Sequence, residues 1–256
     1  MNRLGRVLTP VLFGAVFIGA WEGFVRLFDI KRFLLPRPSA IWTAFGDNID
    51  QIREAARITG TNAVYGLIVG VLLGVAAALL CSRFRFVNDT VTPLASAVNA
   101  MPIIAVAPVF NIWFGTTNSF SRRAVVILVV FFPVFVNVAK GLTQVDATQL
   151  ELMRSYAAPE RDVLRRVRIP NALPFLMSAL RLAASLAVIA AIVAEYFGGT
   201  QGSLGQVITQ SAGLSRYDKA WAAVLAASAI GLGLFGIALL LERIVLPWQR
   251  AAQERV

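Results

Sequence analysis

Six stretches of the chain are each long and apolar enough to cross a lipid bilayer. About 20 residues at a rise of 1.5 Å span the roughly 30 Å hydrocarbon core, so an apolar run of 18 or more residues marks a candidate membrane helix. The sequence therefore predicts an all-α integral membrane protein, in which six helices form one bundle and one domain over residues 1–256. The predicted spans are Thr9–Phe28, Thr61–Ser82, Val91–Phe114, Ala124–Leu142, Leu173–Phe197 and Trp221–Leu246.

The composition agrees with lipid as the main solvent of the folded chain. Hydrophobic residues make up 57% of the 256 residues and charged residues 15%, whereas soluble domains are about half apolar and about a quarter charged. The net charge of +10 would also suit a nucleic-acid-binding protein. However, most arginines flank the apolar runs, where they act as interface anchors and topology signals. We therefore expect contact with membrane lipid and none with nucleic acid.

The distribution of arginine and lysine between the predicted loops orients the chain. Cytoplasmic loops carry an excess of these residues, and the larger share falls on the N-terminal side of the membrane. Six crossings then place both termini and the loop 143–170 in the cytoplasm. The first span follows Arg3 and Arg6, as in a signal peptide, but it is long for one and Trp21–Gly23 is a poor cleavage site. We expect an uncleaved anchor.

The residue inventory argues against several kinds of site. The chain has no histidine and a single cysteine, Cys81. These counts exclude a His-based catalytic triad, a structural zinc site and an intramolecular disulfide. The sequence also lacks the phosphate-binding pattern G-x-x-x-x-G-K-[ST]. We therefore expect no catalytic residue, no metal and no cofactor bound by this chain, and an intramembrane enzyme is disfavoured.

Small residues and prolines distinguish the second and third spans. Gly66, Gly70 and Gly74 stand four apart and form one stripe on a helix, which favours close packing against a neighbouring helix. In the third span, interior prolines bend the helix, and bent helices often line transport pathways. The candidate residues for the translocation path in this span are Asn99, Met101, Pro102 and Pro108.

Two glutamates lie in or near apolar segments, where ionisable groups are costly and hint at function. Glu195, near the outer end of the fifth span, is a further candidate for the path. It could instead be hydrated at the interface or bonded to a neighbouring helix, and a structural role is favoured over contact with a solute. We expect Glu22 to pair with Arg26, four residues on. The outer loop Asp29–Gly60 should hold a short surface helix capped by Ser39.

The loop 143–170 predicts two short amphipathic helices. Leu150, Met153 and Ala157 recur at helical spacing in the first. Pro159 is well placed to start the second, which Pro170 should end, with Asn171 capping the next span. Such a pair on the cytoplasmic side could present a platform to another protein or lie as a basic element on anionic lipid. The spacing alone leaves both interpretations open.

The spacing of this loop resembles a signature of permease subunits of ATP-binding-cassette (ABC) importers: Glu-Ala-Ala, three residues, Gly, nine residues, Ile, one residue, Leu-Pro. Leu152 and Met153 replace the two alanines. Alanine for glycine at position 157 is the mildest departure, on the interpretation that the turn requires no positive φ angle. The matching positions are Glu151, Ala157 for the glycine, Val167 for the isoleucine, Ile169 and Pro170.

Further segments resemble the nitrate/sulfonate/taurine branch of these permeases, which includes permeases for thiamine pyrimidine precursors and riboflavin. These segments are Leu35–Ser39, Met101–Pro108 with Trp113–Gly115, and Ala194–Gly198 with Gly202–Gly205. The resemblance implies a type I importer permease in the plasma membrane of a prokaryote. The implied partners are a second permease copy in a homodimer, two ATPase subunits that bind ATP and Mg, and an extracytoplasmic binding protein.

The resemblance also implies a mechanism of rigid-body alternating access, driven by the ATPase through a coupling helix after Pro159. The residues implied in coupling are Glu151, Ala157, Pro159, Glu160, Arg161, Val163, Leu164, Ile169 and Pro170. The solute would be sulfonate-, nitrate- or taurine-like, or a pyrimidine precursor or riboflavin. The alternative is an ion-coupled secondary transporter, which predicts carboxylates near the midplane. The middles of the spans hold almost none.

Overall fold

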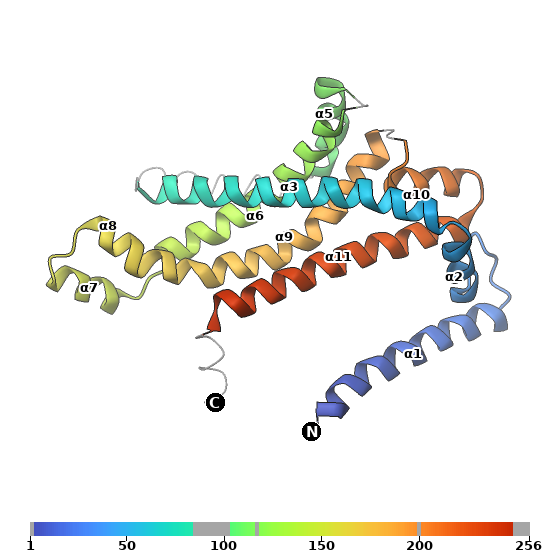
Figure 1. Cartoon of the computed structure of the whole chain (residues 1–256), viewed down its shortest axis with the longest axis horizontal. Helices are drawn as coiled ribbons and strands as arrows, with labels where there is room; N and C mark the ends of the chain where they lie inside the picture. The colour runs from blue at the N-terminus through green and yellow to red at the C-terminus, as the bar shows by residue number, and fades with distance from the viewer. Residues whose placement is uncertain (1–2, 84–102, 116–117, 199–200, 248–256) are drawn as a thin grey trace.

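A computed structural model describes residues 3–83, 103–115, 118–198 and 201–247, and every regular element within these ranges is helical (Figure 1). The all-α prediction is therefore confirmed. The elements are α1 (Arg3–Leu27), α2 (Pro38–Asp47), α3 (Ile49–Arg83), the 3₁₀ turn η1 (Ile103–Val106), α5 (Ala107–Phe114), α6 (Ser119–Thr143), α7 (Ala147–Ser155), α8 (Glu160–Val163), the π-helical turn η2 (Leu164–Arg168), α9 (Ile169–Gly198), α10 (Leu204–Gly213) and α11 (Tyr217–Val245).

Five helical segments of the described residues are long and apolar enough to cross a membrane. They coincide with five of the six predicted spans. The first half of the remaining span, Val91–Phe114, lies outside the described residues, and its second half forms η1 and α5. The number of six crossings therefore stays a prediction. The five segments are Leu8–Leu27, Ile49–Ser82, Ser119–Thr143, Glu160–Gly198 and Tyr217–Val245.

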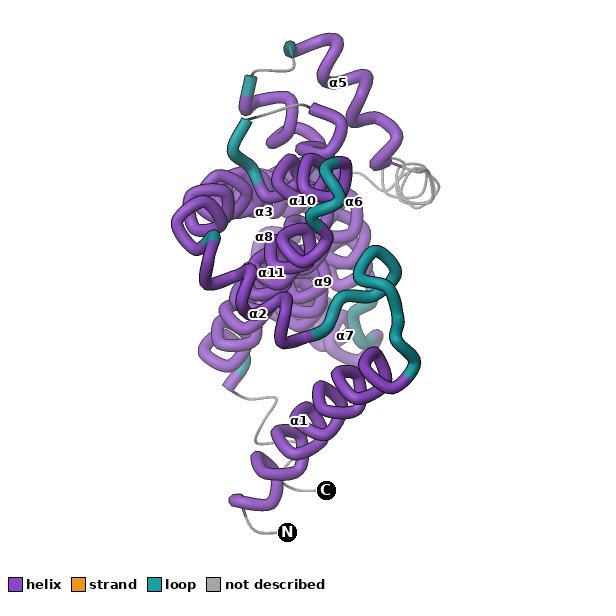
Figure 2. Tube along the Cα trace, turned by 90° about the vertical axis from the view of Figure 1, so that its right-hand side faces the viewer, coloured by secondary structure: helices purple, strands orange, loops and turns teal. Residues whose placement is uncertain are grey.

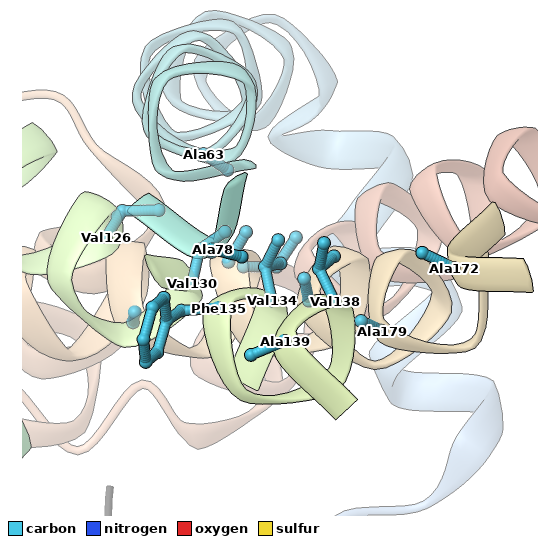
Figure 3. Close-up of a cluster of buried hydrophobic side chains, with 14 of the residues drawn as sticks. Ala63, Ala78, Val126, Val130, Val134, Phe135, Val138, Ala139, Ala172 and Ala179 are labelled. Carbon is cyan, nitrogen blue, oxygen red and sulfur yellow. The ribbon is translucent and has the colours of Figure 1, made fainter. Parts of the chain in front are cut away.

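The core of the bundle lies between α3, α6 and α9 and is built mainly from alanine and valine (Figure 3). On α3, the glycine stripe faces α6: a Cβ at Gly70 would lie 2.8 Å from Val130 Cβ, and one at Gly74 would lie 3.0 Å from the Phe131 carbonyl oxygen. A Cβ at Gly66 would clash with Val126. The absence of side chains at these positions therefore lets the two backbones approach closely.

Helix α1 diverges from this bundle in both views (Figures 1 and 2). Its side chains are among the most exposed of the described spans, and large apolar residues such as Phe13 and Phe17 point outward. A helix that is apolar and exposed along its length suits lipid as its solvent. Glu22 near its end pairs with Arg26 at 2.7 Å, as predicted.

The outer segment Asp29–Gly60 is more helical than predicted. It contains α2, and α3 begins at Ile49, well before the predicted start at Thr61. Ile52 and Ala55 in this extension are buried against α10 and α11, while the polar residues between them face outward. A search for uninterrupted apolar runs misses such an amphipathic extension, because its mean hydropathy is low.

The prediction that Ser39 caps α2 is wrong, because Pro38 starts the helix one residue earlier and Arg37 is the N-cap residue. Ser39 instead donates its backbone N–H and its hydroxyl to the Glu22 carboxylate, at 3.0 and 2.9 Å. Glu22 of α1 therefore provides the acceptor that the start of α2 needs, and holds α1 to α2.

Candidate functional site

The predicted coupling residues lie at one end of the molecule, where α7 and α8 connect α6 to α9 (Figure 1). The base of this hairpin is tightly packed, since a Cβ at Gly141 would lie 2.7 Å from Ala172 Cα. Asn171 Nδ2 donates to the carbonyl oxygens of Gly141 and Gln144, at 2.8 and 2.9 Å. Asn171 thus satisfies the last carbonyls of α6 rather than capping α9 as predicted, because those carbonyls have no partner within their own helix.

Helix α7 stands away from the rest of the bundle. Its N-cap residue Asp146 accepts a hydrogen bond from Thr148 N–H at 2.9 Å, and no residue of the helix is buried. Of the predicted apolar face, Leu150 and Met153 are half-buried. Glu151 is exposed, as are the apolar side chains of Leu152 and Tyr156. Exposed apolar groups around a carboxylate make this a surface suited to another protein.

The turn after α7 contains a residue in the left-handed backbone conformation, contrary to the prediction from the sequence. Ala157 has φ +47°, its N–H donates to the Arg154 carbonyl at 2.9 Å, and Ala158 N–H donates to the Met153 carbonyl at 3.0 Å. This pair of hydrogen bonds is the Schellman motif, whose left-handed position is usually glycine. The interpretation that position 157 needs no positive φ is therefore wrong. The geometry gives a physical reason for glycine at this place in the importer signature.

Helix α8 begins at Glu160, directly after Pro159, in agreement with the predicted start of the second short helix. Val163 is buried and Leu164 is half-buried against the core, whereas Arg161 is exposed. The basic and acidic side chains form loose pairs, Arg166 with Asp162 at 4.0 Å and Arg168 with Glu160 at 3.8 Å. One face of α8 is thus attached to the bundle and the other is charged and accessible.

Pro170 does not end this helix as predicted. Helix α8, the π-helical turn η2 and α9 run on without a break, as one helical segment from Glu160 to Gly198. A proline ring normally clashes with the carbonyl four residues before it. The wider π turn, in which Ile169 N–H donates to the Leu164 carbonyl, ends at Arg168, two residues before Pro170, and accommodates the ring. Helices α8 and α9 are therefore parts of one continuous helical segment.

A cavity of about 610 Å³ opens beside this hairpin, between the end of α3 and the turn from α7 to α8. Two leucines and one serine line it together with three arginines and one glutamate. A partner with both apolar and acidic groups would be accommodated there. The lining residues are Leu79, Ser82, Arg154, Glu160, Arg161, Leu164 and Arg168.

At the other end of α9, Glu195 joins three helices. It is 1% exposed, and its carboxylate accepts hydrogen bonds from Thr59 Oγ1 at 2.8 Å, Asn62 Nδ2 at 3.3 Å and Gly205 N–H at 3.2 Å. Arg122 of α6 also lies close enough to attract its charge. These contacts favour the structural alternative for Glu195. Its place in the path stays a prediction.

Sequence reasoning missed Thr59, Asn62 and Arg122 as parts of this cluster. Thr59 and Asn62 are three positions apart and so share one face of α3. Two polar residues at this spacing, in a segment predicted to be an outer loop, do not indicate that they bind a distant carboxylate. Helix α10 was also missed. The signal was Ser203 followed three residues later by Gln206, the sequence pattern of a capping box. In the structure the N-cap Ser203 Oγ accepts from Gln206 N–H, while Gln206 Oε1 accepts from Gly202 N–H, one residue before the N-cap.

The candidates for the translocation path are only partly described. Asn99, Met101 and Pro102 lie outside the described residues. Pro108 is exposed in the first turn of α5, directly after the 3₁₀ turn. Nearby, the Ser121 hydroxyl of α6 donates to Asn111 Oδ1 of α5, which holds these two helices together.

Comparison with known proteins agrees with this arrangement. Residues 70–250 match the family described as binding-protein-dependent transport system inner membrane component. The chain is 32% identical to the formylaminopyrimidine transport permease protein ThiX of Halalkalibacterium halodurans, over 98% of this chain and 99% of that protein. It is 30% identical to a probable ABC transporter permease protein of Haemophilus influenzae, over 94% and 98% of the two chains.

A third relative, the putative aliphatic sulfonates transport permease protein SsuC of Bacillus subtilis, is 27% identical over 94% of this chain and 87% of its own. These relatives extend over nearly the whole length of the chain, and all carry the description of permease. A multi-pass plasma-membrane location and the role of permease subunit in an ABC importer follow from this match and from the apolar helices. The chain belongs to the family of binding-protein-dependent transport system inner membrane components.

Proposed function

We propose that this chain is a single permease domain that forms one half of an alternating-access path, and that α7 and α8 are its seat on a separate ATPase subunit. In this arrangement two copies of the chain pair as a homodimer, each contacting one ATPase subunit, and a binding protein delivers the solute from the other side. ATP and Mg are bound by the ATPase, and this chain is not itself catalytic.

The continuous helix from Glu160 to Gly198 is the observation that carries this proposal. Its 39 residues extend over about 58 Å at 1.5 Å per residue, longer than the hydrocarbon core. The first turn, α8, presents a charged face outward, and the far end holds Glu195 in its contacts with α3 and α10. A force on α8 therefore reaches the opposite side of the membrane without crossing a flexible joint.

The surface around α8 supports a protein partner over a lipid surface. Glu151 is exposed at the same end as the arginines, and a carboxylate is repelled by anionic lipid. Leu152 and Tyr156 add exposed apolar area. Burial of this area against a complementary protein surface would stabilise a complex. The three arginines that line the 610 Å³ cavity then offer sites for acidic side chains of the ATPase.

The solute proposed for the path is small and belongs to the classes named in the relatives: aliphatic sulfonates, a formylaminopyrimidine or riboflavin. The proposed lining is Asn99, Met101, Pro102 and Pro108, with Glu195 as a further candidate. With both termini in the cytoplasm, α7 and α8 face the ATPase and the N-terminal end of α3 faces the binding protein.

Glu151→Lys and Leu152→Asp test this assignment. Both change exposed side chains of α7 and leave the buried core intact, so we expect a normally folded bundle. ATPase co-purification and uptake into proteoliposomes should each fall at least ten-fold, because a reversed charge or a charge in an apolar contact typically costs a few kcal/mol. Asp50→Lys changes an exposed carboxylate at the other end of the molecule and is the matched control for ATPase co-purification. Normal ATPase binding and uptake in both α7 variants would refute the assignment.

A further inference from the structure

A second, smaller cavity lies at the end of the bundle away from α7 and α8, between the first turns of α6 and the outer part of α3. Its volume is about 210 Å³, and two of its walls carry arginine. The cavity borders the Glu195 cluster, since Asn62 belongs to both. The lining residues are Arg57, Ile58, Thr61, Asn62, Ser119 and Arg123.

The Arg123 guanidinium is held by a hydrogen bond at one edge and by an aromatic ring against one face. Its Nε–H donates to Asn62 Oδ1 at 3.2 Å, and its guanidinium lies over the Tyr65 ring, 4.7 Å from the ring centre. Asn62 is oriented in turn, because its Nδ2 donates to the Glu195 carboxylate at 3.3 Å. Nε and the guanidinium face are thus engaged, and within the described ranges the two Nη groups have no acceptor, so they remain to donate elsewhere.

The charges around the cavity leave one positive charge unbalanced. Arg57 is paired with Glu54 through two hydrogen bonds of 3.1 and 2.7 Å, and the buried Arg122 is not among the lining residues. Among the residues that the structure describes, no acidic side chain lies within 4.0 Å of Arg123. The surplus is therefore a single positive charge on Arg123.

The other lining groups add donors without adding charge. Ser119 Oγ accepts a hydrogen bond from Arg122 Nη2 at 3.3 Å, so its own hydroxyl hydrogen is left to donate. Arg57 uses Nε and Nη2 on Glu54, which leaves Nη1. A planar or tetrahedral oxyanion accepts several such hydrogen bonds at once, and charge-assisted bonds to arginine are the stronger kind.

We propose that this cavity binds the oxyanion group of a singly charged ligand, a carboxylate or a sulfonate, with Arg123 as its main charge partner. The binding chemistry is independent of the function proposed above. The source of the ligand rests on that function, since the proposed orientation turns this end of α3 away from the cytoplasm. The oxyanion is then that of the incoming solute, and the cavity is a first subsite on its way into the bundle.

Methanesulfonate is the probe for this site, and dimethyl sulfone is its uncharged counterpart. Binding is measured by isothermal titration on the full-length permease purified with its ATPase, at constant ionic strength in chloride. We expect the wild type to bind methanesulfonate and not dimethyl sulfone, and Arg123→Gln to bind at least ten-fold more weakly. Arg123→Lys should retain part of the affinity. Arg53→Gln, an exposed arginine one turn before Arg57 and outside the cavity, should bind as the wild type does.

A second arm separates two sources of the same chemistry. If methanesulfonate does not bind, but Arg123→Gln weakens docking of the binding protein ten-fold and Arg123→Lys restores it, the oxyanion is a carboxylate of that partner. Equal behaviour of Arg123→Gln and wild type in both arms, or equal binding of dimethyl sulfone, overturns the proposal. Should Arg123→Gln fold poorly, Arg57→Gln on the opposite wall replaces it, with a several-fold loss expected and no loss overturning the site. ATPase association stays normal in all of these variants, so failure here is distinguishable from failure of the coupling assignment.

Discussion

Ala157 has a left-handed backbone at the position of the α7–α8 turn where the importer signature has glycine. For a residue with a Cβ this conformation costs roughly 1–2 kcal/mol. The two hydrogen bonds that close the Schellman motif hold the conformation in place. The shape of the turn is therefore kept without the residue that favours it, and the strain lies in the element that we propose to contact the ATPase.

Ala157→Gly should relieve this strain and stabilise the end of α7 by about 1 kcal/mol, because glycine adopts positive φ at no steric cost. Slower hydrogen exchange of the amides of α7 and of the following turn would show the effect. Ala158→Gly is the matched control, since residue 158 has no positive φ, and it should leave exchange unchanged or faster. If both substitutions accelerate exchange alike, position 157 is not strained.

Glu195 shows a second way in which one residue decides local structure. A buried carboxylate in a membrane protein is costly unless its oxygens are bonded. Here both oxygens accept hydrogen bonds, from α3 on one side and from the start of α10 on the other. The same Asn62 that donates to Glu195 also orients Arg123, so the structural cluster supports the proposed oxyanion site beside it.

At the scale of elements, the close contact between α3 and α6 depends on the absence of side chains at the glycine stripe of α3. The glycine stripe admits the valines of α6 to the backbone of α3, with Val130 against Gly70 at the centre (Figure 3). Membrane helices have no hydrophobic driving force between them, so close van der Waals contact of this kind supplies much of their association. The stripe therefore holds together the α3–α6 pair against which α9 packs.

Gly70→Val should lower the stability of the purified protein by about 1–3 kcal/mol, the usual range for overpacking a core. The new Cβ would lie 2.8 Å from Val130 Cβ and 3.0 Å from the Ile127 carbonyl oxygen. Because Ile127 O is a backbone atom, these clashes can be relieved only if α3 and α6 move apart. The measurement is the Tm in detergent. Gly233→Val adds the same side chain to α11 where nothing lies within 4 Å, and should leave the Tm nearly unchanged. An equal fall in both variants would show that propensity, not packing, is responsible.

At the scale of the whole molecule, the two ends of the bundle have different chemistry. One end carries α7, α8 and their arginines, and the other carries α2, α10 and the Glu195 cluster (Figure 1). Helix α1 is apolar and mostly exposed, and diverges from the bundle beyond its contact with α2 (Figure 2). Membership of the importer-permease family favours alternating access driven by an ATPase over the ion-coupled alternative.

The proposed orientation predicts which end meets the cytoplasm. In a Cys81→Ala background, which removes the single cysteine, Ser155→Cys in α7 and Asp50→Cys at the start of α3 place one exposed thiol at each end. A membrane-impermeant maleimide should label Asp50→Cys in intact cells and Ser155→Cys only in inside-out vesicles. The reverse pattern would invert the topology and move the coupling surface to the outside.

The sequence by itself determined the features that depend on local composition. Apolar runs located all five described spans to within a few residues at most ends, because crossing hydrocarbon requires about 20 consecutive apolar residues whatever their neighbours are. Pro159 predicted the start of α8, which the structure confirms, and the spacing from Glu151 to Pro170 resembles the importer signature. The Glu22–Arg26 pair followed from helical spacing alone.

Only the tertiary structure decided the features that depend on distant partners. Glu195 accepts a hydrogen bond from Thr59, which is 136 residues away in the sequence. The Asn171 side chain donates to carbonyl oxygens at the end of α6 instead of capping its own helix, because those carbonyls have no partner within α6. The start of α3 at Ile49 depends on burial against α10 and α11. Pro170 stays helical because the π turn moves the clashing carbonyl. Each outcome depends on which groups packing brings together, and a single sequence carries no local signal of that.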